Sequence, residues 1–391
     1  MVSPSLIGGL ASRAVFLMSS QANFKPQAEY QANTIAAIET LQGWYNRASG
    51  LWDTTGWWNS ANVLTALADF AALQPAASRE LGLAEVIQNT YVQAQKTTVQ
   101  ATKILSFNGL PTSTYFRVPK LRISQRGFDD FLNDFYDDEG WWALALIRAY
   151  DLGVLGLGNE RYLPQAEEIF EDMKKGNSTC GGIYWSKTVK YTNAIANELY
   201  LSTAASLANR VSEKKDYYLD IALAQWDWFK NSGMINKDNL INDGLTDDCE
   251  NNGMQTWTYN QGVILGALVE LSTATGDLSL LDEATKIAIA AITHLSEDGV
   301  LHEGCEPNCG ADGAQFKGIF MRNLHYLQKA KPSEPIKNFI LRNADAIWAK
   351  DRSERNELGV TWNGPYVNAT AGTHSSALDV LVGAVAVSSP A

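Results

Sequence analysis

The stretch GWWALALIRAYDL, at residues 140–152, resembles two other stretches of the chain. These are GWWNSANVLTALADF at residues 56–70 and TYNQGVILGALVEL at residues 258–271. Each opens with aromatic and polar residues and continues with small and aliphatic ones. Small residues let helices pack closely in an inner ring, and an aromatic and polar first turn suits the rim of a cavity. The similarity indicates weak internal repetition with a period of roughly 60 residues, as expected of stacked helical hairpins.

Apolar residues recur three and four positions apart along most of the chain, which is typical of amphipathic helices. Alternation typical of strands is nearly absent. We predict helices near residues 26–48, 57–74, 79–104, 128–152, 160–175, 190–210, 214–231, 258–275, 279–296, 316–330, 334–350 and 374–388. Twelve helices in six pairs would close into a ring of helical hairpins. Since no linker or low-complexity segment interrupts the pattern, we expect an all-α chain that forms a single domain over residues 1–391.

The composition fits a large globular core. Of the 391 residues 46% are hydrophobic, and the chain contains 12 Trp, 15 Tyr and 13 Phe. The surplus of Trp indicates an aromatic-lined cleft. The formal net charge is −12, and no cluster of Lys and Arg stands out. Nucleic acids and anionic membranes bind such clusters, so the charge argues against both as partners.

The four cysteines suggest disulfides. Cys305 and Cys309 enclose only Glu-Pro-Asn, and a zinc site would need remote histidines because His is scarce. The chain has only His294, His302, His325 and His374. We therefore predict the disulfides Cys180–Cys249 and Cys305–Cys309 in preference to a metal site.

The chain carries only weak targeting signals. Its start, MVSPSLIGGLASRAVFLMSS, lacks a basic region and is interrupted by Arg13, so we interpret residues 1–22 as a poorly ordered or leader-derived N-terminus. No apolar run approaches the ~18 residues needed to span a bilayer, and residues 377–387 are interpreted as a final core helix. Asn177-Ser-Thr and Asn368-Ala-Thr are glycosylation sequons. We expect a secreted or cell-wall-associated glycoprotein without a membrane span.

Paired carboxylates are the strongest catalytic signal. Residues 135–146 read FYDDEGWWALAL, with Asp137 and Asp138 just before Trp141 and Trp142. Adjacent carboxyl groups sheltered from water are costly to ionise together, which suits an acid paired with a base or nucleophile. Cleavage of a glycosidic bond needs two carboxyl groups and a surface that holds the sugar, and indoles provide such a surface. The alternative is that both Asp residues only cap a helix that starts near Glu139.

Six segments of the chain resemble one family in the same order. They are TGWWNSANVLTALADF at 55–70, YDDEGWWALALIRAYDL at 136–152, CGGIYWSKTVKYTNAIANELYL at 180–201, INDGL at 241–245, TYNQGVILGALVELSTATGD at 258–277 and FKGIFMR at 316–322. In this order they are similar to glycoside hydrolase family 76, the endo-α-1,6-mannanases, and especially to its fungal members. Six segments over this span are far more specific than one Asp pair.

The resemblance implies an (α/α)6 barrel with an open cleft. It also implies retaining hydrolysis of α-1,6-mannosidic bonds without metal or cofactor, with Asp137 as the nucleophile and Asp138 as the general acid/base. Retaining chemistry needs carboxyl groups about 5–5.5 Å apart, a distance that neighbouring residues can meet.

The residues expected to bind substrate carry an aromatic face or a hydrogen-bonding group. They are Trp58, Asn59, Asn62, Trp141, Trp142, Asn193, Asn197, Asp243, Tyr259, Asn260, Gln261, Phe316, Lys317 and Arg322. Neighbours on a helix point about 100° apart, so one Trp of each doublet should pack in the barrel while the other faces the cleft. Asn59 as a helix cap and Asp243 as an Asx turn remain alternatives. Lys317 and Arg322 are expected to pair with cleft carboxylates or sugar oxygens.

Three kinds of function fit these patterns. The first is a monomeric endo-α-1,6-mannanase that acts on mannan or oligomannosides. The second is a cell-wall transglycosidase of the same family that acts on mannose-containing glycan of lipid anchors. The third is a non-catalytic mannan-binding protein, or an epimerase or lyase on the same helical ring. The presence of both Asp137 and Asp138 argues against a non-catalytic protein, and the scarcity of His argues against an epimerase. The acids Asp247, Asp248 and Glu250 are expected in a solvated loop.

Overall fold

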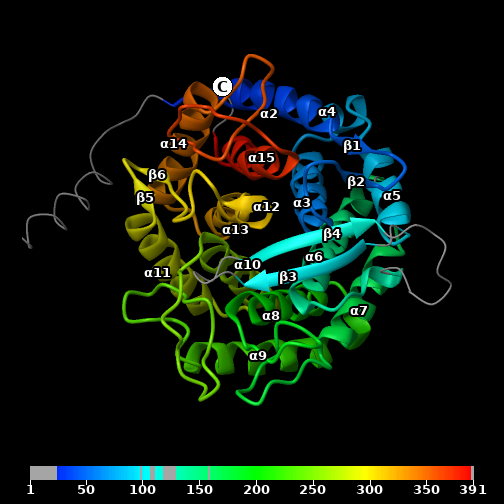
Figure 1. Ribbon diagram of the computed structural model, residues 1–391, viewed down its shortest axis with the longest axis vertical. Coiled ribbons are helices and arrows are strands. Elements are labelled where there is room, and N and C mark those ends of the chain that lie inside the picture. Colours follow the sequence, from blue (N-terminus) through cyan, green and yellow to red (C-terminus); the bar gives the residue numbers. More distant parts are fainter. Residues whose placement is uncertain (1–23, 97–98, 106–110, 118–128, 157–158, 389–391) are drawn as a thin grey trace, which may run out of the picture.

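Six helices form a closed inner ring in the computed structural model, which describes residues 24–96, 99–105, 111–117, 129–156 and 159–388. They are α3 (Trp57–Leu73), α6 (Tyr136–Asp151), α8 (Ala194–Ala208), α10 (Thr258–Thr275), α13 (Phe316–Ala330) and α15 (Ala371–Val387). Each packs against the next, and α15 packs against α3. Figure 1 looks down the axis of this ring.

Six further helices surround the inner ring. They are α2 (Gln27–Gln42), α5 (Leu83–Ala94), α7 (Tyr162–Met173), α9 (Lys215–Asn231), α11 (Ser279–His294) and α14 (Glu334–Lys350). They cover α15, α3, α6, α8, α10 and the pair α13–α15, in that order. Inner helices such as α8 and α15 are buried nearly along their whole length, whereas outer helices bury one face. The predicted all-α fold, an (α/α)6 barrel, is confirmed.

Small residues in the inner helices permit close packing, as the sequence predicted. A Cβ atom added to Gly262 of α10 would lie 2.5 Å from the Cα atom of Phe320 in α13. A Cβ atom on Gly318 of α13 would lie 2.5 Å from the Cα atom of Ser376 in α15. Neither approach is possible for a residue with a side chain, so glycine sets the spacing of three consecutive inner helices.

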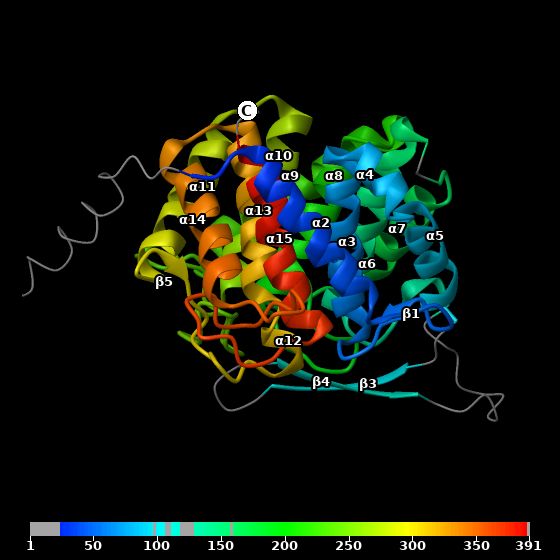
Figure 2. The same ribbon diagram turned by 90° about the horizontal axis from the view of Figure 1, so that it is seen from above.

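The prediction of a helix over residues 79–104 is wrong in its second half. Helix α5 ends at Ala94, and β3 (Val99–Leu105) pairs antiparallel with β4 (Pro111–Arg117). Val99 lies opposite Arg117, and Leu105 lies opposite Pro111. The strands are rich in Thr, Val, Ile, Tyr and Phe, and an Asn-Gly pair at 108–109 separates them in the sequence, which is a strong hairpin signal. The hairpin crosses the end of the barrel at which the inner helices begin (Figures 1 and 2).

The remaining regular structure consists of short elements between longer irregular loops. They are α4 (Pro75–Glu80), α12 (Gly310–Gly313), the 3-10 segments η1 (Asp129–Phe131), η2 (Leu152–Leu155) and η3 (Ser212–Lys214), and the strand pairs β1 (Tyr45–Asn46) with β2 (Leu51–Trp52) and β5 (Ser296–Glu297) with β6 (Val300–Leu301). The helices predicted over 26–48, 128–152 and 190–210 are therefore shorter than expected. The predicted leader at residues 1–22 lies outside the described part of the chain. Within that part, no helix is both long and apolar enough to cross a membrane.

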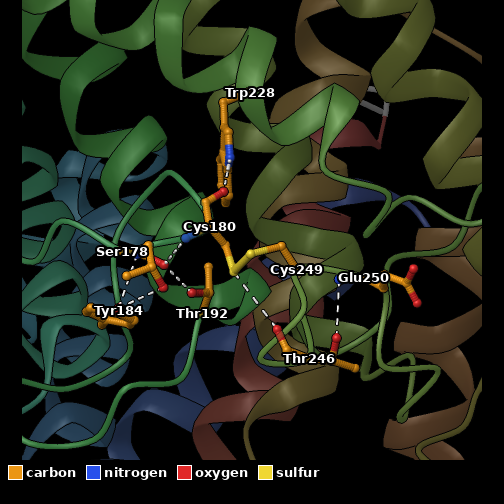
Figure 3. The surroundings of a disulfide bond; sticks show 9 residues. Ser178, Cys180, Tyr184, Thr192, Trp228, Thr246, Cys249 and Glu250 are labelled. Atoms are coloured by element: carbon orange, nitrogen blue, oxygen red, sulfur yellow. Dashed lines mark hydrogen bonds between the residues drawn. A yellow bond between two sulfur atoms is a disulfide. The ribbon is translucent and has the colours of Figure 1, made fainter.

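Both predicted disulfides are confirmed. Cys180–Cys249 joins the loop between α7 and α8 to the loop between α9 and α10 (Figure 3). The indole Nε1 of Trp228 donates to the Cys180 carbonyl oxygen at 2.9 Å, which fixes the first of these loops on α9. Cys305–Cys309 closes a short loop before α13. Since all four cysteines are oxidised, none can serve as a zinc ligand in this structure.

Candidate active site

The paired carboxylates lie in the first turn of α6, at the end of the barrel that the hairpin crosses. Asp137 is 5% exposed and Asp138 is fully buried. The helix starts at Tyr136 and not near Glu139, and its N-cap residue, Phe135, makes no side-chain capping bond. The Tyr136 backbone N–H instead donates to the Trp185 carbonyl oxygen at 3.0 Å. Both carboxyl groups thus sit where the helix macrodipole favours negative charge.

Asn133 holds Asp138 in place. Its Nδ2 donates to Oδ2 of Asp138 at 2.7 Å, and its Oδ1 accepts from the Phe135 backbone N–H at 2.9 Å. The Asn133 backbone N–H also donates to Glu139 at 2.8 Å. Sequence reasoning missed this residue, although an Asn two positions before a helix N-cap is typical of an Asx turn.

An ion cluster of two buried acids and a more exposed lysine supports the same turn from behind. Lys187, in the loop between α7 and α8, pairs with Glu139 at 2.7 Å and with Asp172 of α7 at 2.5 Å. Glu139 is fully buried, so it needs this partner. The cluster fixes the α7–α8 loop against the helix that carries the two aspartates.

Asp243 brings a third carboxyl group to the site. It is 2% exposed, and the Tyr191 hydroxyl donates to its Oδ2 at 2.5 Å. Burial raises the pKa of Asp243 to about 6, the Tyr191 and Asn260 side chains lower it, and the charge of Asp137 raises it. Asp243 is therefore close enough to Asp137 to interact with it electrostatically. A carboxyl group of α6 and one of the loop before α10 are thus neighbours at this end of the barrel.

An aromatic stack crosses the same end of the barrel. The ring centroids of Trp58 and Trp141 lie 5.5 Å apart with planes 23° apart. Trp141 and Tyr259 follow at 6.5 Å and 24°, and Tyr259 and Phe316 at 3.9 Å and 12°. The Trp58 indole donates to Asp312 at 2.9 Å. Four inner helices, α3, α6, α10 and α13, each contribute one ring.

The two indoles of each Trp doublet contact different partners, and all four are buried, so it stays a prediction that one of each pair faces a cleft. Trp58 stacks on Trp141, while the ring centroids of Trp57 and Trp142 lie 5.4 Å apart. The ring centroids of Trp142 and Phe131 lie 4.6 Å apart. All four indoles are at most 3% exposed. Trp58 and Trp141 thus form one wall as a packed stack, and Trp57 and Trp142 pack behind it.

Three predicted residues connect loops to the inner ring. Asn193 is the N-cap of α8, and its Oδ1 accepts from the Ala196 backbone N–H at 3.3 Å. Asn197 bonds to both the N–H and the carbonyl of Ile183. The Gln261 side chain likewise accepts from the N–H of Ile241 and donates to its carbonyl oxygen. These amides position the loops that carry Tyr191 and Asp243.

Two further amides lie beside the aromatic stack. Asn59 donates to the Gln315 side chain at 2.9 Å, which links α3 to the residue before α13. Asn260 is fully buried and lowers the pKa of Asp243. Asn260 therefore belongs with the carboxyl cluster, whereas Asn59 links inner helices and is not a helix cap.

The structure does not bring Lys317 and Arg322 to the carboxyl cluster. Lys317 pairs with Glu306 at 2.6 Å and is 1% exposed. Arg322 bonds to Asn62 and lies 3.6 Å from Asp379 of α15. Both cations do pair with carboxylates, but with Glu306 and Asp379, which are not members of that cluster.

A cavity of about 690 Å³ opens at the opposite end of the barrel. It is lined by late residues of the inner helices, such as Ser206, Glu270 and Lys329, and reaches Trp141 at its inner end. Asn62 and Arg322 line it as well. The cavity is therefore behind the aromatic stack and distinct from the carboxyl cluster. The predicted solvated loop is confirmed, because residues 246–250 are all exposed.

Comparison with known proteins identifies the family. The model of glycosyl hydrolase family 76 matches residues 27–390. A mannan endo-1,6-alpha-mannosidase of Candida albicans is 25% identical over 385 residues, covering 89% of this chain and 78% of that protein. A putative mannan endo-1,6-alpha-mannosidase of Schizosaccharomyces pombe is 28% identical over 229 residues, covering 54% of this chain and 51% of its own length.

Solved structures share the fold. An inactive variant of an alpha-1,6-mannanase of Salegentibacter sp., in complex with alpha-1,6-mannotriose, superposes with a TM-score of 0.74 at 20% identity, covering 92% of this chain and 99% of its own. Dfg5 of Chaetomium thermophilum, in complex with glucosamine, has a TM-score of 0.74 at 17% identity. The match covers 95% of this chain and 94% of that chain. The family match extends over nearly the whole chain, and the folds agree. The chain belongs to glycosyl hydrolase family 76.

Proposed function

We propose that this chain is a retaining endo-α-1,6-mannanase, with Asp137 as the nucleophile and Asp138 as the general acid/base. The observation that carries the proposal is the buried pair in the first turn of α6, next to Asp243 and an aromatic stack. The curated relatives are named as mannan endo-1,6-alpha-mannosidases. In the inactive Salegentibacter variant, two consecutive aspartates are replaced by asparagine.

The proposed reaction has two steps. The Asp137 carboxylate attacks the anomeric carbon and forms a β-mannosyl ester, while Asp138 gives its proton to the departing glycosidic oxygen. Asp138 then takes a proton from water, and the water oxygen attacks the same carbon and releases Asp137. The product keeps the α configuration because the carbon is inverted twice. Asn133 fixes the Asp138 carboxyl group before substrate binds.

Asp243 suits the role of a hydroxyl acceptor. Its pKa of about 6 makes it an anion at neutral pH, and Tyr191 holds one of its oxygens. A buried carboxylate binds a sugar hydroxyl strongly because it is a charged acceptor in a water-poor site. The stack from Trp58 to Phe316 provides apolar surface at the same end of the barrel.

We also propose that the protein is secreted or associated with the cell wall. Two disulfides support an oxidising compartment. Asn177 and Asn368, the two sequon residues, are both exposed. Glycosylation of these residues remains a prediction.

Product analysis on linear α-1,6-mannan tests the function. The wild-type chain should release oligomannosides of mixed length, and proton NMR should detect the α anomer before mutarotation. Asp137→Asn should fold normally and lose several orders of magnitude in turnover. Addition of a second sugar as acceptor separates transfer from hydrolysis, because a transglycosidase would form elongated products. Release of mannose alone from chain ends, or of the β anomer, would contradict the proposal.

A further inference from the structure

Glu198 of α8 is an unusual residue for its position. It is fully buried in the inner ring, and neither of its carboxyl oxygens has a hydrogen-bond partner within the described chain. Burying an unpaired carboxyl group is costly, and such a group in a native protein usually has a functional reason. Glu139, a buried acid in the first turn of α6, is by contrast paired with Lys187.

The helix register directs Glu198 toward the axis of the barrel. Ser202 and Ser206 follow it at intervals of four residues, so all three share one face of α8. Both serines line the cavity at the opposite end of the barrel. Toward the carboxyl cluster, the Ala194 N–H, one turn before Glu198 in α8, donates to the Asp243 carbonyl oxygen at 2.8 Å. Asp243 therefore lies against the start of α8, and its charge acts on Glu198. Glu198 thus lies between the carboxyl cluster and that cavity.

We propose that Glu198 is a positioning residue of the active site, an uncharged carboxylic acid behind Asp243 that holds the Asp243 carboxylate ionised and aimed at the substrate. The proposal rests on the proposed function, in which Asp243 accepts a sugar hydroxyl. Glu198 acts through Asp243 and does not itself touch the sugar.

The groups on the side of Glu198 that faces the carboxyl cluster favour its neutral form. Burial and the charge of Asp243 both hold the pKa of Glu198 well above its usual range. Asp243 in turn interacts with Asp137 of α6 and accepts from Tyr191. Tyr259 of α10 has its pKa raised by burial and by Asp243, Asp137, Tyr191 and Glu198. A second negative charge here would repel those of Asp243 and Asp137, whereas a carboxylic acid can direct its O–H dipole at Asp243.

The other helices packed on α8 supply no cation to Glu198 among the residues that the structure describes. From α9, Gln225 donates to Asn197 at 3.0 Å. From α7, Asp172 pairs with Lys187. No neighbouring positive charge therefore offsets ionisation of Glu198, which agrees with its assignment as a neutral acid.

The test compares Glu198→Leu with Glu198→Gln by the pH profile of kcat/KM on a linear α-1,6-mannotetraoside. The leucine removes the dipole behind Asp243, so Asp243 should bind its proton more tightly. The acid limb of the profile should move up by about one pH unit, and kcat/KM at pH 5 should fall about tenfold. The glutamine is neutral and polar, so it should keep the wild-type limb and activity within about threefold. If the leucine variant does not fold, Glu198→Met, which is unbranched and of similar size, carries the same test.

Ser202→Ala, one turn along the same face of α8, is the matched control and should leave the limb unchanged. An acid limb that does not move in Glu198→Leu would overturn the proposal. An acid limb that moves up in Glu198→Gln as far as in Glu198→Leu would overturn it as well. An acid limb that moves down in Glu198→Gln would also overturn it, because loss of a negative charge would mean that Glu198 is ionised. Failure of the proposed function is separate, since it would appear as an active Asp137→Asn variant.

Discussion

The Cys180–Cys249 disulfide should stabilise this protein much more than Cys305–Cys309 does. The first bridge joins residues 69 apart in the sequence, and the second joins residues 4 apart. A cross-link lowers the chain entropy of the unfolded state by an amount that grows with the logarithm of the enclosed loop. This relation gives about 4 kcal/mol for the long loop and about 2 kcal/mol for the short one.

The structure also predicts what removal of Cys180–Cys249 leaves intact. The two loops that it joins are held together near the site by backbone bonds, from Ala194 N–H to the Asp243 carbonyl at 2.8 Å and from Leu245 N–H to the Thr192 carbonyl at 2.9 Å. The substitution of both cysteines by serine should therefore lower stability while turnover at low temperature changes little.

The assay is urea unfolding followed by tryptophan fluorescence, with the free energy of unfolding obtained by linear extrapolation. The double serine variant of Cys180 and Cys249 is compared with that of Cys305 and Cys309 and with the wild type. Equal losses in the two variants, or a larger loss for the short loop, would refute the entropic reasoning. A collapse of kcat in the folded Cys180 variant would refute the claim that backbone bonds hold the site.

Three further predictions concern packing, catalysis and pH. Gly262→Ala should destabilise the fold by about 1–3 kcal/mol, because the added methyl group meets the backbone of α13; an unfolding free energy equal to wild type would contradict the close approach. Asn133→Ala removes a 2.7 Å bond to Asp138 and should lower kcat by about 10- to 100-fold with little change in KM, in steady-state kinetics on an oligomannoside. Burial raises the pKa values of Asp351 and Asp379 to about 8, above their unfolded values of about 3.9. The folded state then binds more protons than the unfolded state, so the free energy of unfolding should fall as pH rises from about 6.5 to 8.5. Urea titrations in which this free energy stays constant or rises over that range would contradict the raised pKa values.

Much of the fold could be predicted from the sequence because the inner helices differ from the outer ones in composition. The aromatic first turns and small-residue bodies of α3, α6 and α10 indicated the inner ring directly. The helix predicted over residues 79–104 includes residues whose side chains favour strands, and the structure places β3 there. The Asn-Gly pair at 108–109 is the local signal for the β3–β4 hairpin.

The sequence indicated which carboxyl groups lie near one another, but not the contacts around them. Asp137, Asp138 and Asp243 come together, as their residue types suggested. Whether an amide such as Asn197 faces a sugar or a loop depends on contacts with residues far away in the sequence, and Asn197 in fact binds Ile183. The same applies to Lys317, which pairs with Glu306 and not with the cleft. Glu198 had a local signal, since it is the only charged residue of α8.

The roles of Asp137 and Asp138 can be separated by the product that azide forms on an activated aryl α-1,6-mannobioside. With Asp138→Ala, azide should attack the β-mannosyl ester on Asp137 and yield the α-mannosyl azide. With Asp137→Ala there is no ester, so azide should attack the α-linked substrate directly and yield the β-mannosyl azide. Proton NMR distinguishes the two anomers. We predict the α-azide from Asp138→Ala and the β-azide from Asp137→Ala, and the reverse result would contradict the assigned roles.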